Sequence, residues 1–167
     1  MKKRTKFLVT GGLIAAIYAA TTYVAAAFNL AYLGVQFRFS EALTILPVFT
    51  PAAIPGLIIG CFLANLGSSM ALDVIIGTAA TTLAAFCSYY TRKITFKGLP
   101  LLSLIFPVII NAVFIGAEIA FCFLPQGATL DGFLISALQV GTGQLAVCYG
   151  LGLPLYTILN KYKTKIF

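Results

Sequence analysis

The strongest constraint on this chain is its shortage of charge between long apolar runs. Of 167 residues, 60% are hydrophobic and only 9% are charged, whereas soluble domains carry about 25% charged residues. Such a chain has too little polar sequence to cover a water-soluble fold, so a soluble enzyme is excluded. At about 1.5 Å per helical residue and about 30 Å per bilayer crossing, its length permits about five to seven membrane helices.

The apolar runs predict an all-α membrane protein with a single domain over residues 1–167. Residues 42–70 permit one long helix or two shorter helices that break at Pro51 and Pro55. Proline lacks an amide N–H and disfavours a helical conformation in the preceding residue, so the break is favoured. We expect six helices, at roughly residues 7–27, 40–50, 55–70, 72–91, 99–124 and 131–159.

The first apolar run also resembles a secretory signal peptide, because the basic collar at residues 2–6 precedes it and residues 25–27 are alanines. Its apolar length of about twenty residues exceeds that of most signal-peptide cores. The rest of the chain also consists of apolar runs long enough for membrane helices. We therefore interpret this run as a retained first helix.

Charge decides the number of crossings. Ten of the eleven Lys and Arg residues lie in three clusters, within residues 2–6, 92–97 and 161–165. Basic clusters beside membrane helices stay on the cytoplasmic side, and six crossings place all three there, with only Arg38 outside. Five crossings would put the last two clusters opposite the first. We therefore expect a multi-pass cell-membrane protein with six transmembrane helices and both termini in the cytoplasm.

The sequence lacks the motifs of enzymes and metal proteins. It has no histidine, no Cys-x-x-Cys pair, no phosphate-binding Gly-x-x-x-x-Gly-Lys loop and no nucleophile elbow. We expect no catalytic residue, metal or cofactor, and any ATP hydrolysis must come from another protein. The net charge of +7 is explained by membrane orientation, so no nucleic-acid partner is expected. The cysteines are expected to be small buried residues: Cys61, Cys87, Cys122 and Cys148.

The four acidic residues all fall in the outer half of the expected bundle. Glu41, Asp73 and Asp131 begin helices, where the helix dipole stabilises a carboxylate. Glu118 lies about four-fifths along the fifth expected helix and has no such explanation. Because a carboxylate at membrane depth is costly and usually marks a function, Glu118 is favoured as a functional residue and Asp131 as a structural one.

Amide and aromatic side chains accompany these acids. Interhelical hydrogen bonding explains Asn111 and Gln144 equally well, and Arg38 can simply pair with Glu41. A site with this lining, open to the outside, suits a small planar ligand rich in hydrogen-bond donors. A carboxylate accepts two N–H bonds from a guanine-like edge, and aromatic rings cover its faces. The other members of this polar and aromatic set are Tyr32, Gln36, Phe37, Phe39, Asn65 and Gln139.

Small residues recur every four positions along the first helix in two ridges. One ridge is Gly11, Ala15 and Ala19, and the other is Gly12, Ala16 and Ala20. Such ridges let membrane helices approach closely. The partner of a ridge can be another helix of this chain or a second membrane protein, and the sequence leaves both interpretations open.

Three segments resemble the QueT family, the queuosine-precursor substrate-binding (S) components of energy-coupling factor (ECF) transporters. They are residues 35–46 (VQFRFSEALTIL), Pro55-Gly56-Leu57 with Gly60-Cys61 and Ala64-Asn65, and Leu72-Asp73-Val74 with Gly77-Thr78. The resemblance covers essentially the whole chain, including its length and its six expected helices.

The resemblance implies an S-component bundle in the lipid membrane that works with a transmembrane coupling protein (EcfT-like) and two cytoplasmic ATPases. Its substrate would be a 7-deazaguanine such as 7-aminomethyl-7-deazaguanine or queuine, captured from outside and delivered inward by tipping in the membrane. Carboxylates would suit the guanine-like edge and the aminomethyl cation. The Ala15-x-x-x-Ala19 ridge resembles the family's docking surface for the coupling protein.

We expect Glu118, Asp73, Asn65 and Glu41 to be the leading substrate contacts, with a second rank of Gln36, Arg38, Asn111 and Gln139. An alternative is an S component for another vitamin, such as a flavin, thiamine or folate. A more distant alternative is a small membrane-embedded enzyme or an assembly factor.

Overall fold

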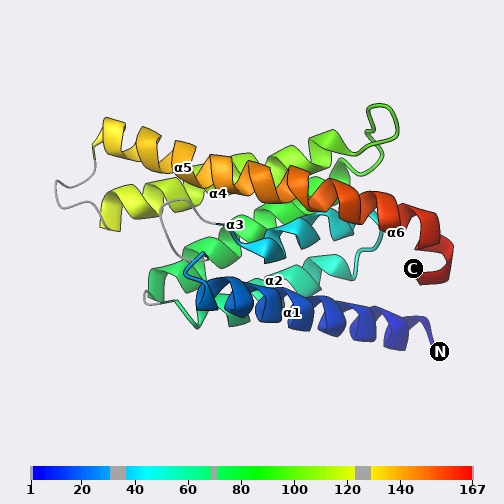
Figure 1. The fold of residues 1–167 in the computed structure, drawn as a ribbon. Coiled ribbons are helices and arrows are strands. Elements are labelled where there is room, and N and C mark those ends of the chain that lie inside the picture. The colour runs from blue at the N-terminus through cyan, green and yellow to red at the C-terminus, as the bar shows by residue number, and fades with distance from the viewer. Residues whose placement is uncertain (1, 31–36, 69–70, 123–128, 167) are drawn as a thin grey trace.

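The computed structural model describes residues 2–30, 37–68, 71–122 and 129–166. Within these ranges the protein is built from helices joined by turns, and the only β pairing is an isolated bridge between Phe96 and Leu99. The elements, shown in Figure 1, are α1 (Lys3–Ala27), η1 (Phe39–Val48), α2 (Ala53–Asn65), α3 (Ala71–Tyr90), α4 (Leu101–Cys122), α5 (Leu130–Gly150) and α6 (Gly152–Ile166).

The expected all-helical fold is confirmed, with two changes of detail. The second expected helix, at residues 40–50, is a 3-10 helix rather than an α-helix, and Pro47 lies inside it. The last expected helix, at residues 131–159, consists of α5 and α6, which meet at Leu151. The break expected near Pro51 separates η1 from α2.

Four helices are long and apolar enough to cross a bilayer, and the other two are short. The long ones are α1, α3, α4 and the continuous segment Leu130–Lys163. With ten residues in η1 and 13 in α2, each spans about 20 Å at about 2.0 and 1.5 Å rise per residue, less than the apolar core of a membrane. The described chain therefore has four helices long enough to span a membrane and two shorter apolar helices, η1 and α2, packed among them.

The short helix η1 lies at the centre of the bundle and contacts each of the six α-helices. Successive residues of η1 enter two different apolar clusters. Leu46 packs with Tyr18 and Leu57, whereas Ile45 packs with Leu104 on the other side. Because η1 is buried on both sides, its polar side chains must find partners inside the protein.

Helices α1 and α2 pack at close range through small residues. A Cβ atom on Gly60 would lie 2.7 Å from Cβ of Tyr18 and 2.9 Å from the carbonyl oxygen of Ala15. Ala15 and Ala19 are buried, at 5% and 9% exposure, so in this structure they pack inside the chain rather than on a free docking surface. The other ridge, Gly12, Ala16 and Ala20, is exposed.

Both termini and the turn at residues 91–100 lie at one end of the bundle (Figure 1). The three basic clusters therefore share that end, as their placement in the sequence predicts. Among the cysteines, Cys61 and Cys148 are buried, Cys87 is half-buried and Cys122 is exposed at the end of α4. The expectation that all four are buried is wrong for Cys122, since an apolar run in a membrane helix includes its lipid-facing side.

We predict that Gly60→Ala lowers the stability of the protein, because the added methyl group overlaps α1 backbone. Overpacking a close contact costs about 1 to 3 kcal/mol. Gly12→Ala is the matched control, since nothing lies within 4 Å of a Cβ added there. Thermal unfolding in detergent measures both. Equal melting temperatures for Gly60→Ala and the wild type would contradict the close packing of α1 and α2.

Candidate functional site

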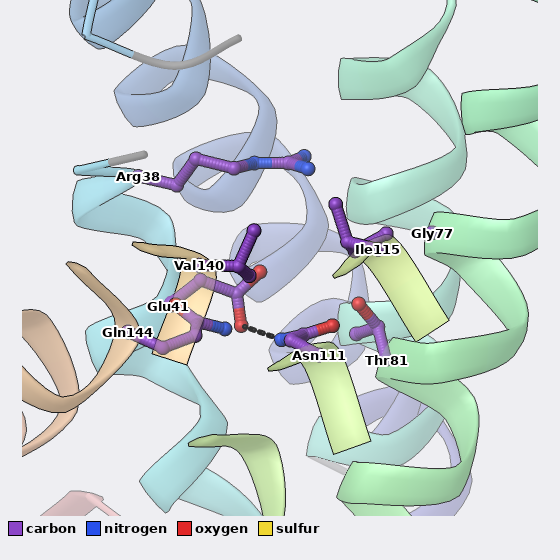
Figure 2. Close-up of a pocket in the computed structure, with 8 residues that line it drawn as sticks. All are labelled: Arg38, Glu41, Gly77, Thr81, Asn111, Ile115, Val140 and Gln144. Atoms are coloured by element: carbon purple, nitrogen blue, oxygen red, sulfur yellow. Dashed lines mark hydrogen bonds between the residues drawn. The ribbon is translucent and has the colours of Figure 1, made fainter. Parts of the chain in front are cut away.

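A buried carboxylate, Glu41, joins three elements at the centre of the bundle. Glu41 lies in the first turn of η1 and is 2% exposed. The Tyr18 hydroxyl of α1 donates to its Oε1, and Nδ2 of Asn111 in α4 donates to its Oε2 at 3.4 Å (Figure 2). A buried carboxylate needs such donors to replace water. Glu41 therefore positions η1 against α1 and α4 while its charge faces inward.

Asn65, at the end of α2, connects the other side of the site. It accepts a hydrogen bond from Nη2 of Arg38 at 2.7 Å through Oδ1, and its Nδ2 donates to the backbone oxygen of Asp73 at 2.9 Å. Gly77 in α3 makes room for this amide, because a Cβ there would lie 2.6 Å from the Asn65 Nδ2. The side chain thus links η1, α2 and α3.

These residues surround a small cavity. Figure 2 shows the Arg38 side chain extending above Glu41 and Asn111. The cavity volume is about 10 Å³, which is room for about one water molecule. Four of its eight lining residues have polar side chains that were singled out from the sequence. The full lining is Arg38, Glu41, Gly77, Thr81, Asn111, Ile115, Val140 and Gln144.

The structure brings together some of the predicted site residues and separates others. Arg38, Glu41 and Asn111 line the cavity, and Asn65 is bonded to Arg38. Gln139 is exposed on α5 and lies outside the lining; its neighbour Val140 faces the cavity instead. Since successive residues of a helix point about 100° apart, the Gln139 assignment missed the inward face by one position.

Several other residues that the sequence predicts around the site do not line the cavity. Phe37 and Phe39 are each 37% exposed rather than enclosed around the cavity. Asp131 is exposed at the start of α5, which agrees with its structural interpretation. Gln36 and Tyr32 lie outside the described residues.

The sequence analysis did not name Thr81, and it left Gln144 open between an interhelical hydrogen bond and a place in the site. Thr81 follows Gly77 by four residues and Asp73 by eight, a spacing that places all three on one face of a helix. This spacing is the feature of the sequence that could have identified Thr81 as a site residue. Gln144 follows Val140 by four residues in the same way, but either face of α5 could have been the inner one.

Two further carboxyl groups lie one helical turn from the cavity lining, toward the end of the bundle away from the termini. Glu118 is one helical turn beyond Ile115 in α4, and Asp73 is one turn before Gly77 in α3. Glu118 is 3% exposed, and neither of its carboxyl oxygens has a hydrogen-bond partner among the described residues. Asp73 is half-buried and accepts a hydrogen bond from the Ser68 hydroxyl. Glu118 lies near both the Asp73 carboxyl group and the Arg38 guanidinium, so one like and one opposite charge act on it.

Comparison with known proteins supports a transport function. The model of the QueT transporter family matches residues 8–161. Over 80 residues the chain is 34% identical to the queuosine precursor transporter QueT of Lactococcus lactis subsp. cremoris strain MG1363. That match spans 48% of this chain and about half of the relative, 47% of its length. No solved structure matches the chain.

The family consists of transporters, in agreement with the expectation that the chain is not an enzyme. Because the family match extends over nearly all of the residues that build this bundle, the chain belongs to the QueT transporter family.

Proposed function

We propose that this protein is the substrate-binding membrane component of an ECF-type importer for a queuosine precursor, a 7-deazaguanine. The relative's name and the family support the substrate class. The observation that carries the proposal is the buried Glu41 carboxylate beside the amides of Asn111 and Gln144 in one cavity. A coupling protein and two cytoplasmic ATPases would supply the energy, since this sequence has no ATP-binding loop.

The cavity chemistry suits the pyrimidine edge of a deazaguanine. That edge presents adjacent N–H donors, which a carboxylate accepts as a pair of charge-assisted bonds. Amide side chains such as Asn111 and Gln144 supply both a donor and an acceptor for the remaining ring atoms. A site with buried polar groups also rejects ligands that leave those groups unpaired.

In this structure the cavity is closed. Pockets for small molecules usually enclose about 300 to 1,000 Å³, far more than the cavity offers. The Arg38 side chain lies above Glu41 and Asn111 (Figure 2). It donates a hydrogen bond to Asn65. Ligand entry therefore requires the Arg38 side chain to leave Asn65, and we propose that Arg38 gates the cavity.

The charge distribution suggests the direction of transport. Basic clusters stay on the cytoplasmic side of membranes, so the end with both termini would face the cytoplasm. Arg38 would then close the cavity toward the outside. The exposed ridge Gly12, Ala16 and Ala20, rather than the buried Ala15 and Ala19, is the surface of α1 open to a coupling protein.

We predict that Glu41→Gln weakens binding of 7-aminomethyl-7-deazaguanine by at least tenfold, because a hydrogen bond to a charged group contributes about 1.5 to 3 kcal/mol. Calorimetry on the purified protein measures the affinity. Asp131→Asn removes the same charge from an exposed position and is expected to bind as the wild type does. Equal affinities for the two variants would refute the assignment of Glu41.

A competing vitamin is tested with the same preparation. Mass spectrometry of the small molecule that co-purifies with the protein is expected to find a deazaguanine. A flavin, thiamine or folate in its place would overturn the proposed substrate.

The gate makes a kinetic prediction. Arg38→Ala is expected to speed association of the deazaguanine by about tenfold, because the Arg38–Asn65 hydrogen bond no longer has to break. Surface plasmon resonance on the protein in nanodiscs measures the rate. Slower association with weaker binding in Arg38→Ala would instead identify Arg38 as a ligand contact.

A further inference from the structure

A second pocket lies at the end of the bundle that carries both termini. It forms where the first turns of α1 face the turn between η1 and α2 (Figure 1). Its volume is about 160 Å³, whereas pockets for whole small molecules enclose about 300 to 1,000 Å³. The space therefore suits a small ion or one polar group of a larger molecule. The lining residues are Lys3, Lys6, Phe7, Thr10, Thr50 and Ala52.

Helix α1 contributes four of these residues from a single face. Positions i, i+3, i+4 and i+7 of an α-helix lie on the same side, and the residues with this spacing are Lys3, Lys6, Phe7 and Thr10. Directly after them α1 comes into close contact with the η1–α2 turn, because a Cβ atom on Gly11 would lie 3.2 Å from the carbonyl oxygen of Ala52. The two lysines thus belong to a pocket that Gly11 and Ala52 close on its inner side.

Membrane orientation alone does not explain this convergence of lysines. A basic collar needs only to flank an apolar run to keep its side of the membrane. Two cations of the collar, Lys2 and Arg4, are outside the lining, whereas Lys3 and Lys6 share the pocket with two threonine side chains. The collar therefore contains two pairs of cations with the same charge and different surroundings.

Every polar side chain of the lining can donate a hydrogen bond. An ammonium group has three donors and no acceptor, and a hydroxyl has one donor. The Thr50 hydroxyl oxygen accepts a bond from the backbone N–H of Ala52 at 3.3 Å, which leaves its hydrogen to donate elsewhere. Among the described residues, no carboxyl or amide side chain lines the pocket. Its chemical complement is a negatively charged group with several acceptor oxygens.

The acidic side chains are too distant to neutralise the two lysines. The sequence has no Asp or Glu before Glu41. Tyr18, which donates to the Glu41 carboxylate, follows Lys6 by 12 residues, or about 18 Å along α1 at about 1.5 Å per residue. The remaining acidic residues lie toward the opposite end of the bundle: Asp73, Glu118 and Asp131. No Asp or Glu side chain therefore balances the positive charge of the pocket.

We propose that this pocket binds the phosphate group of an anionic phospholipid. Basic pockets between membrane helices on the cytoplasmic side hold anionic lipid headgroups, and this end of the bundle faces the cytoplasm in the orientation proposed above. Phe7, which lines the pocket, is 40% exposed and adjoins Leu8, which is 63% exposed. These side chains offer an apolar surface to the lipid chains, from which a free phosphate ion would gain nothing.

The inference does not depend on the transported substrate, because the pocket and the Arg38–Glu41 cavity share no lining residue. A phosphate bound in the pocket contacts α1 and the η1–α2 turn together. Since a ligand that binds only the folded state raises the melting temperature, an anionic lipid is expected to stabilise the protein.

The test compares the two pairs of collar cations. Native mass spectrometry of the full chain in a neutral detergent measures the affinity for the first bound phosphatidylglycerol and for the first bound phosphatidylcholine. We expect the wild type to bind phosphatidylglycerol at least tenfold more tightly. Lys3→Gln/Lys6→Gln should lose most of that preference, whereas the control Lys2→Gln/Arg4→Gln, which removes the same charge outside the pocket, should keep it. Thermal unfolding with each lipid should show the same order.

Three other results would overturn the proposal. Equal affinity of the wild type for the two lipids would exclude an anionic lipid site. An equal loss of preference in both double variants would show that the collar attracts anionic lipid by its total charge, without a pocket. If inorganic phosphate, compared with chloride at equal ionic strength, stabilises the wild type but not Lys3→Gln/Lys6→Gln, and phosphatidylglycerol has no effect, the pocket binds a free phosphate ion and the lipid assignment fails.

Discussion

The burial of Glu41 on a short helix at the centre of the bundle is the constraint on which the rest of the structure depends. A carboxylate that is 2% exposed needs donors from its neighbours, and Tyr18 and Asn111 provide them from α1 and α4. These bonds hold η1 between two apolar clusters. The cavity is polar because η1 places the Glu41 carboxylate inside the bundle.

Small residues make that arrangement sterically feasible. Gly60 allows α2 to lie against α1 beside Tyr18, and Gly77 leaves space on α3 for the Asn65 amide. The same glycine that admits Asn65 also lines the cavity. Close helix packing and the polar network therefore depend on the same small residue. A larger side chain at Gly77 would displace Asn65, which accepts a hydrogen bond from Arg38.

The two ends of the cavity have different electrostatic characters. Toward the bundle interior, Glu41 is satisfied by neutral donors. Toward the end of the bundle away from the termini, the cation of Arg38 lies near the carboxyl groups of Asp73 and Glu118. A cavity with room for about one water must widen before it can hold a small-molecule ligand.

The hydrophobic composition and the positions of the basic clusters along the chain determined that this is a helical membrane protein with its basic clusters at one end. These properties depend on how residues partition between lipid and water and on the length of each helix, and not on which helix faces pack together. The same reasoning selected Glu41, Asn65 and Glu118 as candidate site residues, since polar groups at membrane depth are costly wherever they lie, and the structure buries all three. Only the tertiary structure decided which helix face turns inward. That choice buried Ala15 and Ala19, exposed Gln139, and brought Thr81 and Gln144 to the cavity. Because the membrane helices of this chain are apolar on most sides, their hydrophobic periodicity does not distinguish the lipid-facing side from the packed side. Contacts with neighbouring helices make that distinction.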